Sequence, residues 1–229
     1  MRKFLCTFVN VNNYLEELLM KRTFTILAAM FMGAMLTSCG QPQESNVNST
    51  DMKAQNAVIE NIMSRRSIRQ YKDGPVARET METILECGIN APNGMNRQSW
   101  EVRVMDNPET VGKLKEYMIQ ANPQANPEGV AGSFRNAPTL IFVANDPSYD
   151  FSAIDCGLLS ENIMLSAWSL GVGSVCLGSP IRYIRNSPQA LEMLGFSEGY
   201  NPIICIGLGY PDETPDAKPR DAGKVKFIE

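Results

Sequence analysis

The stretch DCGLLSENIMLSAWSLGVGSVCL, residues 155–177, gives the clearest structural signal in the chain. Residues 155–170 are apolar on most of a helical circumference, which predicts a buried helix at the centre of the core. Residues 174–177 then form a short apolar run that favours a strand. Both segments therefore belong to the interior of a domain that contains helices and strands.

The neighbouring segments predict the rest of the fold. Apolar residues at helical spacing predict a helix that ends near Ser64, a second that follows Pro75, and further helices over residues 108–120 and 190–194. Residues 100–104, 139–144 and 203–208 have the alternating or continuous apolar pattern of strands. Residues 122–136 are rich in Asn, Pro and Gly, which predicts a loop near the functional site. No strict βαβ rhythm is present, so we expect an α+β fold.

The composition excludes several classes of function. The chain has 229 residues, which allows one domain or at most two, and its net charge of −4 gives no basic footprint for nucleic acid. It contains no histidine, so a Ser-His-Asp triad, a Cys-His dyad and a His-ligated metal site are all excluded. Its chemistry must come from other side chains or from a bound cofactor.

The N-terminal region has the pattern of a targeting segment. Lys21 and Arg22 precede an apolar run at residues 24–36, which is too short to span a membrane and is typical of a signal peptide. The following LTSCG, residues 36–40, resembles a bacterial lipoprotein box, which implies lipidation of Cys39 and a protein anchored by lipid in the cell envelope, facing the periplasm or the surface. The alternative is a plain secretory peptide with an incidental cysteine.

These features divide the chain into three parts. Residues 1–39 contain the signal peptide and an upstream segment, and the acidic residues ahead of Lys21 indicate that translation begins at Met20. Residues 40–51 are polar and read as a flexible tether, and residues 52–229 form the folded domain. Its four cysteines have no CxxC spacing, so buried free thiols are favoured over disulfides, although an oxidising envelope permits the latter. They are Cys87, Cys156, Cys176 and Cys205.

Three polar segments are candidates for a binding site. Residues 64–71, SRRSIRQY, place three arginines and Ser67 close together, which suits an anion because arginine offers paired planar donors. Residues 91–100, APNGMNRQSW, supply amide side chains and a turn that can bind the edge of a polar heteroaromatic ring. Residues 218–220 add two more cations. Taken alone, the arginine segment is equally consistent with a solvated charge cluster. An ordinary helix-to-strand connection is favoured for residues 91–100 alone, and residues 218–220 alone are unremarkable.

Taken together in their order along the chain, these three segments resemble the nitroreductase superfamily of FMN-dependent oxidoreductases. The resemblance covers residues 56–229. Residues 155–164, 170–174 and 206–211 add weaker matches to the family pattern. Asn93 and Ser99 depart from it, since Ser and Pro are commoner there. The resemblance implies a three-layer α+β sandwich with a central antiparallel sheet, and a homodimer in which the tail from about Val225 adds a strand to the partner's sheet.

The resemblance also implies site residues. Ligands of the FMN phosphate and ribityl oxygens would be Arg65, Ser67 and Arg69, with Arg66, Lys218 and Arg220 also contributing. Residues lining the flavin from the partner subunit would be Pro92, Asn93 and Asn96. The strand end whose backbone approaches the flavin would be Cys176, Leu177 and Gly178. No catalytic side chain and no metal ligand is assigned.

The implied activity is the reduction of nitroaromatics, quinones or related electrophiles by NAD(P)H, in ping-pong fashion through FMN. This activity agrees with the absence of histidine, because a flavin carries the hydride itself. One alternative is a flavin-binding envelope lipoprotein that relays electrons to a protein partner. Another is a structural envelope protein that has lost the flavin.

Overall fold

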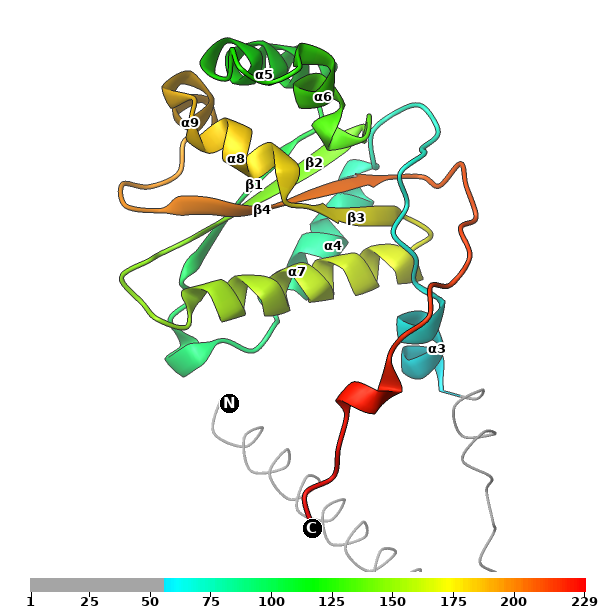
Figure 1. Ribbon diagram of the computed structural model, residues 1–229. Coiled ribbons are helices and arrows are strands. Elements are labelled where there is room, and N and C mark those ends of the chain that lie inside the picture. The colour runs from blue at the N-terminus through cyan, green and yellow to red at the C-terminus, as the bar shows by residue number, and fades with distance from the viewer. Residues whose placement is uncertain (1–55) are drawn as a thin grey trace, which may run out of the picture. The chain divides into compact units, whose positions relative to one another are not determined.

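A four-stranded antiparallel sheet forms the middle of the fold (Figure 1). The structure is a computed structural model that describes residues 56–229, so the expected signal peptide, Cys39 and the tether lie outside the described residues. The strand order is β1-β2-β4-β3. The strands are β1 (Trp100–Met105), β2 (Thr139–Asn145), β3 (Gly173–Leu177) and β4 (Asn201–Gly209).

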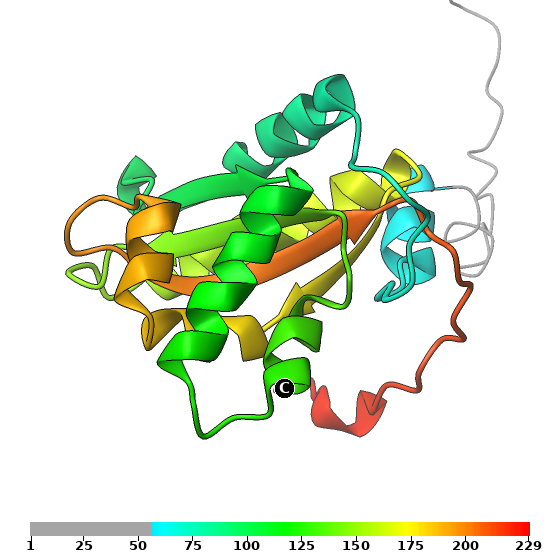
Figure 2. The same cartoon turned by 90° about the horizontal axis from the view of Figure 1, so that it is seen from above.

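Helices cover both faces of the sheet. Helices α4 and α7 lie on one face, and α5, α6, α8 and α9 lie on the other (Figures 1 and 2). The helices are α3 (Ala57–Ser64), α4 (Arg78–Ile89), α5 (Pro108–Ala121), α6 (Pro127–Ala131), α7 (Ser152–Ser169), α8 (Ser179–Arg185) and α9 (Pro188–Leu194). This three-layer α+β architecture confirms the predicted fold class. Among the described residues, no helix is long and apolar enough to cross a membrane.

Each face of the sheet has its own hydrophobic core. Strand β2 is buried along its whole length, and its side chains alternate between the two cores. Phe142 packs edge-on against Phe134 beneath α5 and α8, with 6.1 Å between ring centroids. Ile141 and Val143 face the opposite core, which α4 and α7 cover. The central position of β2 explains why its sequence is a continuous apolar run.

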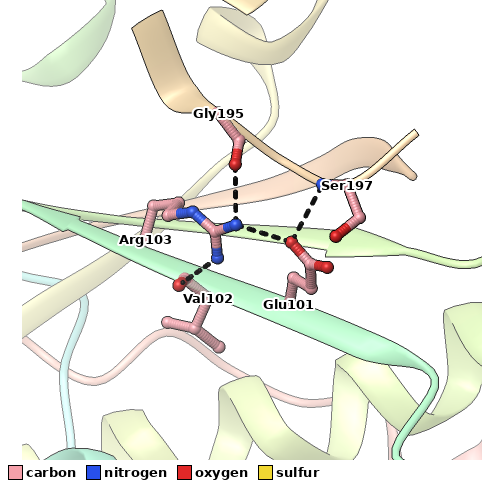
Figure 3. A network of polar contacts seen from close by, with 5 residues as sticks. All are labelled: Glu101, Val102, Arg103, Gly195 and Ser197. Carbon is pink, nitrogen blue, oxygen red and sulfur yellow. Dashed lines mark hydrogen bonds and ion pairs between the residues drawn. The ribbon is translucent and has the colours of Figure 1, made fainter. Parts of the chain in front are cut away.

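An ion pair within edge strand β1, between Glu101 and Arg103, is hydrogen-bonded to the loop before β4 (Figure 3). Nη2 of Arg103 donates to a carboxylate oxygen of Glu101 and to the carbonyl of Gly195, both at 2.7 Å. The backbone amide of Ser197 donates to the same Glu101 oxygen at 3.2 Å. Burial raises the pKa of Glu101, but the hydrogen bonds from Ser197 and Arg103 outweigh it and lower the pKa below its ordinary value.

The predicted helices and strands are confirmed, with three corrections. The predicted loop at 122–136 is wrong, because Pro127 begins the short helix α6 and its Val130 is fully buried. Helix α8, which precedes the predicted helix at 190–194, was not predicted. The prediction that the four cysteines are buried is wrong for Cys87 and Cys176, which are exposed. The prediction that all four are free thiols agrees with the structure.

Candidate functional site

The arginine segment leaves α3 and runs beside edge strand β3. The backbone amide of Ile68 donates to the carbonyl of Ser174 at 3.0 Å, and the Ile68 side chain is fully buried. A Cβ at Gly173 would lie 2.7 Å from the Ile68 side chain, so this close approach requires glycine. Ile68 therefore anchors the segment, while the arginines on either side of it remain accessible.

The segment after β4 runs along the arginine segment on its other side. The amide of Lys72 donates to the carbonyl of Tyr210 at 2.9 Å, and the amide of Asp212 donates to the carbonyl of Gln70 at 3.0 Å. Figure 1 shows the two segments side by side at the β3 edge of the sheet. This pairing brings residues 218–220 close to residues 65–69, although about 150 residues separate them along the chain.

The two segments enclose a hollow of about 450 Å³, which we call the arginine hollow. Its polar and charged lining residues are Arg65, Arg66, Ser67, Arg69, Glu161, Asp216, Lys218 and Arg220. Within residues 56–229, none of its five cations forms an ion pair with a carboxylate. Four of these five cations are arginines. In the described part of the chain, their guanidinium groups donate hydrogen bonds to backbone carbonyls close in sequence, for example Arg69 to Ser67 at 3.0 Å. Each guanidinium has five N–H donors, so several remain for an anion.

Two residues that sequence analysis did not assign hold the arginine segment in place. The Tyr71 hydroxyl donates to the Ile68 carbonyl at 2.5 Å, and a Cβ at Gly209 would lie only 2.8 Å from its ring. Burial, and next the charge of Glu213, raise the pKa of Tyr71. The carboxylate of Glu213 accepts the backbone amides of Arg69 and Gln70. Tyr71 belongs to the quoted motif, but nothing local in the sequence indicates the role of Glu213.

The predicted strand end lies beside the hollow. Cys176 is exposed on β3, Leu177 is buried, and Gly178 precedes the first turn of α8. Partial desolvation and the charge of Glu161 raise the pKa of the Cys176 thiol, and Arg65 opposes them. Glu161 and Arg65 both line the hollow, whereas Cys176 itself is not among the lining residues.

The predicted flavin-lining loop lies at the N-terminal end of α7. The backbone amide of Gly94 and the hydroxyl of Ser99 both donate to the buried carboxylate of Asp155, at 3.1 and 3.0 Å. At the far end of the helix, Trp168 donates to Ser64, next to the arginines, at 2.9 Å. At a rise of about 1.5 Å per residue, Asp155 and Trp168 are about 20 Å apart along the helix. Glu161, the α7 residue that lines the arginine hollow, is closer, about 9 Å along the helix from Asp155. The predicted residues Pro92, Asn93 and Asn96 are nevertheless not among the residues that line the hollow.

This loop has an unusual backbone that its neighbours fix. Met95, Asn96 and Gln98 have φ angles of 53°, 53° and 49°, in the left-handed region that non-glycine residues rarely adopt. The side-chain oxygen of Asn93 accepts the amide of Gln98 at 2.9 Å, which closes the turn. Strained residues of this kind persist where surrounding contacts hold them, and they cluster at ligand sites. The strain therefore supports a binding role for the loop.

Comparison with known proteins agrees with the fold. A family model described as "Nitroreductase family" matches residues 62–210. An NADPH-flavin oxidoreductase of Vibrio harveyi is 30% identical over 181 residues, which cover 72% of this chain and 70% of that protein.

Solved structures give the same result. A nitroreductase with bound FMN from Bacteroides fragilis is 27% identical with a TM-score of 0.69, and the match covers 76% of this chain and 100% of that chain. A second, from Desulfitobacterium hafniense, also with bound FMN, is 30% identical with a TM-score of 0.68, covering 76% and 99%. Since the family model spans more than half of the sequence, this chain belongs to the nitroreductase family.

Proposed function

We propose that this chain is an FMN-dependent oxidoreductase that uses NAD(P)H to reduce nitroaromatics, quinones or related electrophiles. The observation that carries the proposal is the arginine hollow, in which two distant segments converge and leave their cations without carboxylate partners in the described part of the chain. Family membership, FMN-bound structural neighbours and flavin oxidoreductase relatives support the same cofactor and reaction.

The residues of the hollow fit FMN. A phosphate monoester carries nearly two negative charges, and arginine forks bind its oxygens through charge-assisted hydrogen bonds. Arg65, Ser67, Arg69 and Arg220 would hold the phosphate and ribityl oxygens, with Arg66 and Lys218 adding positive charge. A hollow of about 450 Å³ is within the usual range for small-ligand sites.

The chain's own residues bind and orient the cofactor rather than take part in bond making. FMN, when bound, supplies the hydride chemistry that links NAD(P)H to the acceptor. The backbone from Cys176 to Gly178 would approach the reactive edge of the flavin. Because the chain has no histidine, we assign no general base. NAD(P)H and the electron acceptor would bind in turn at the same face of the flavin, which gives ping-pong kinetics.

A second copy of the chain would complete each site. Pro92, Asn93 and Asn96 do not line the hollow of their own chain, so the loop of a partner subunit would cover this cofactor. Phe151, just before α7, and Ile154 and Leu158 in its N-terminal half are 56%, 58% and 41% exposed. This apolar stripe would be buried between the two α7 helices of a homodimer.

The C-terminal tail would strengthen the dimer. Val225, Phe227 and Ile228 are 73–95% exposed, a condition that apolar side chains rarely keep in a finished assembly. Among residues 56–229, β1 pairs only with β2, and its other edge lies beside an apolar groove of about 370 Å³ lined in part by Leu85 and Ile89. We propose that the partner's tail pairs along this edge and fills the groove.

We further propose that Cys39 anchors the domain to an envelope membrane by lipid, on the sequence pattern alone. Incorporation of a labelled fatty acid into the chain, and its loss in Cys39→Ser, tests the anchor. An unlabelled wild-type chain in a bacterial host that labels other lipoproteins would refute it.

Steady-state turnover tests the proposed reaction. We expect NADH or NADPH oxidation that depends on FMN and on a nitroaromatic or quinone, with parallel lines in double-reciprocal plots. A protein that binds FMN but turns over no small acceptor would instead favour electron relay to a protein partner. A protein that binds no flavin would favour a structural role.

A further inference from the structure

Glu213 makes an arrangement that the proposed cofactor chemistry does not use. One carboxylate oxygen, Oε1, accepts the backbone amides of two consecutive residues, Arg69 and Gln70, the second at 3.1 Å. The half-buried side chain comes from the segment that carries Lys218 and Arg220. Glu213 therefore joins the two segments that form the arginine hollow.

The charge of Glu213 is unfavourable for an anion site. A carboxylate close to the hollow lowers the positive potential that attracts a phosphate. Among residues 56–229, Glu213 forms no ion pair with a cation that would offset this effect. Its contribution must therefore come from the geometry that its two hydrogen bonds impose on the backbone at Arg69.

We propose that Glu213 is a positioning residue for the cofactor phosphate. It fixes the backbone of the arginine segment, so that Arg69 and Ser67 are held against the hollow before the ligand arrives. The proposal rests on the proposed function, because it takes FMN as the ligand. Ordering a donor in advance removes part of the entropy loss of binding.

Three substitutions of Glu213 separate geometry from charge. Glu213→Gln keeps a carbonyl oxygen that accepts both amides and removes the charge, so we expect an FMN dissociation constant equal to or lower than that of the wild type. Glu213→Ala removes the acceptor, and Glu213→Asp keeps the charge but shortens its reach. Both should raise the dissociation constant about three- to tenfold. Asp212→Ala is the matched control, because it removes a neighbouring exposed carboxylate and leaves its backbone bond to Gln70 intact.

Amide hydrogen exchange of the FMN-free protein gives a second readout that does not depend on activity. The amides of Arg69 and Gln70 should be protected in the wild type and in Glu213→Gln, and exchange about tenfold faster or more in Glu213→Ala and Glu213→Asp. A general loss of stability would instead speed exchange across the sheet. If Glu213→Ala does not fold, the Gln and Asp variants decide between geometry and charge.

Two results would overturn the proposal. The first is wild-type FMN affinity and amide protection in the Ala and Asp variants. The second is weaker FMN binding in Glu213→Gln together with wild-type affinity in Glu213→Asp, which would assign the effect to charge. If the wild type itself binds no FMN, the proposed function fails instead, and exchange at the two amides still reports whether Glu213 holds this backbone.

Discussion

Replacement of Arg65 by alanine should weaken FMN binding strongly. Arg65 is half-buried at the hollow, and the described contacts use one of its N–H groups, on the Arg66 carbonyl at 3.3 Å. Its remaining donors can form a charge-assisted pair with phosphate, which contributes roughly 1.5–3 kcal/mol. Since about 1.4 kcal/mol corresponds to a tenfold change, the dissociation constant should rise about ten- to a hundredfold.

Fluorescence titration of FMN with the purified apoprotein measures this change. The matched control is Arg78→Ala, which removes an exposed arginine at the start of α4, away from the hollow. The control should bind like the wild type, and the difference between the two variants should shrink as salt screens the phosphate. Equal FMN affinity in Arg65→Ala and the wild type would refute the phosphate assignment.

Three further predictions test the loop, the sheet edge and the dimer. In Gly94→Ala, the new Cβ would lie 2.0 Å from the Tyr149 hydroxyl, so the end of this side chain must move aside and stability should fall by about 1 kcal/mol. An unchanged urea midpoint would contradict this contact. Because the pKa of Glu101 is lower in the folded than in the unfolded state, its ionised form stabilises the fold at pH values above the unfolded-state pKa. This stabilisation is lost as the pH falls through the lower, folded-state pKa. Glu101→Gln should therefore be less stable than the wild type at pH 7 and equal to it at pH 2, whereas the same difference at both values would show that the charge plays no part. Leu158→Asp should be monomeric by light scattering and should lose FMN, while its circular dichroism spectrum stays that of the folded wild type. If this variant is still a dimer, the interface lies elsewhere.

Long elements with a clear period were predictable from the sequence. The periodicity of residues 155–170 and the continuous apolar run of β2 identify α7 and β2 because burial on many sides leaves little polar surface. Helix α6 was mistaken for a loop because it has only five residues, and its Asn126-Pro127 start has the composition of a turn. Helix α8 is also short, and it follows β3 without a connecting loop.

The sequence identified the separate segments of the candidate site, but it could not show how the fold brings them together. The arginine segment and residues 218–220 were both identified, and the fold joins them in one hollow. Glu213 was missed because it acts on backbone amides distant in sequence, which leaves no local pattern. Likewise, sequence periodicity could not distinguish buried Cys205 in a central strand from exposed Cys176 at a sheet edge, because both occur in apolar runs.

The visible absorption spectrum of the purified protein, titrated with FMN, tests the central claim most directly. We expect that each chain retains one FMN after dialysis, that NADH or NADPH bleaches the flavin spectrum, and that a nitroaromatic restores it. A colourless protein that retains no FMN would refute the cofactor assignment, and the arginine hollow would then be a solvated cluster of charges.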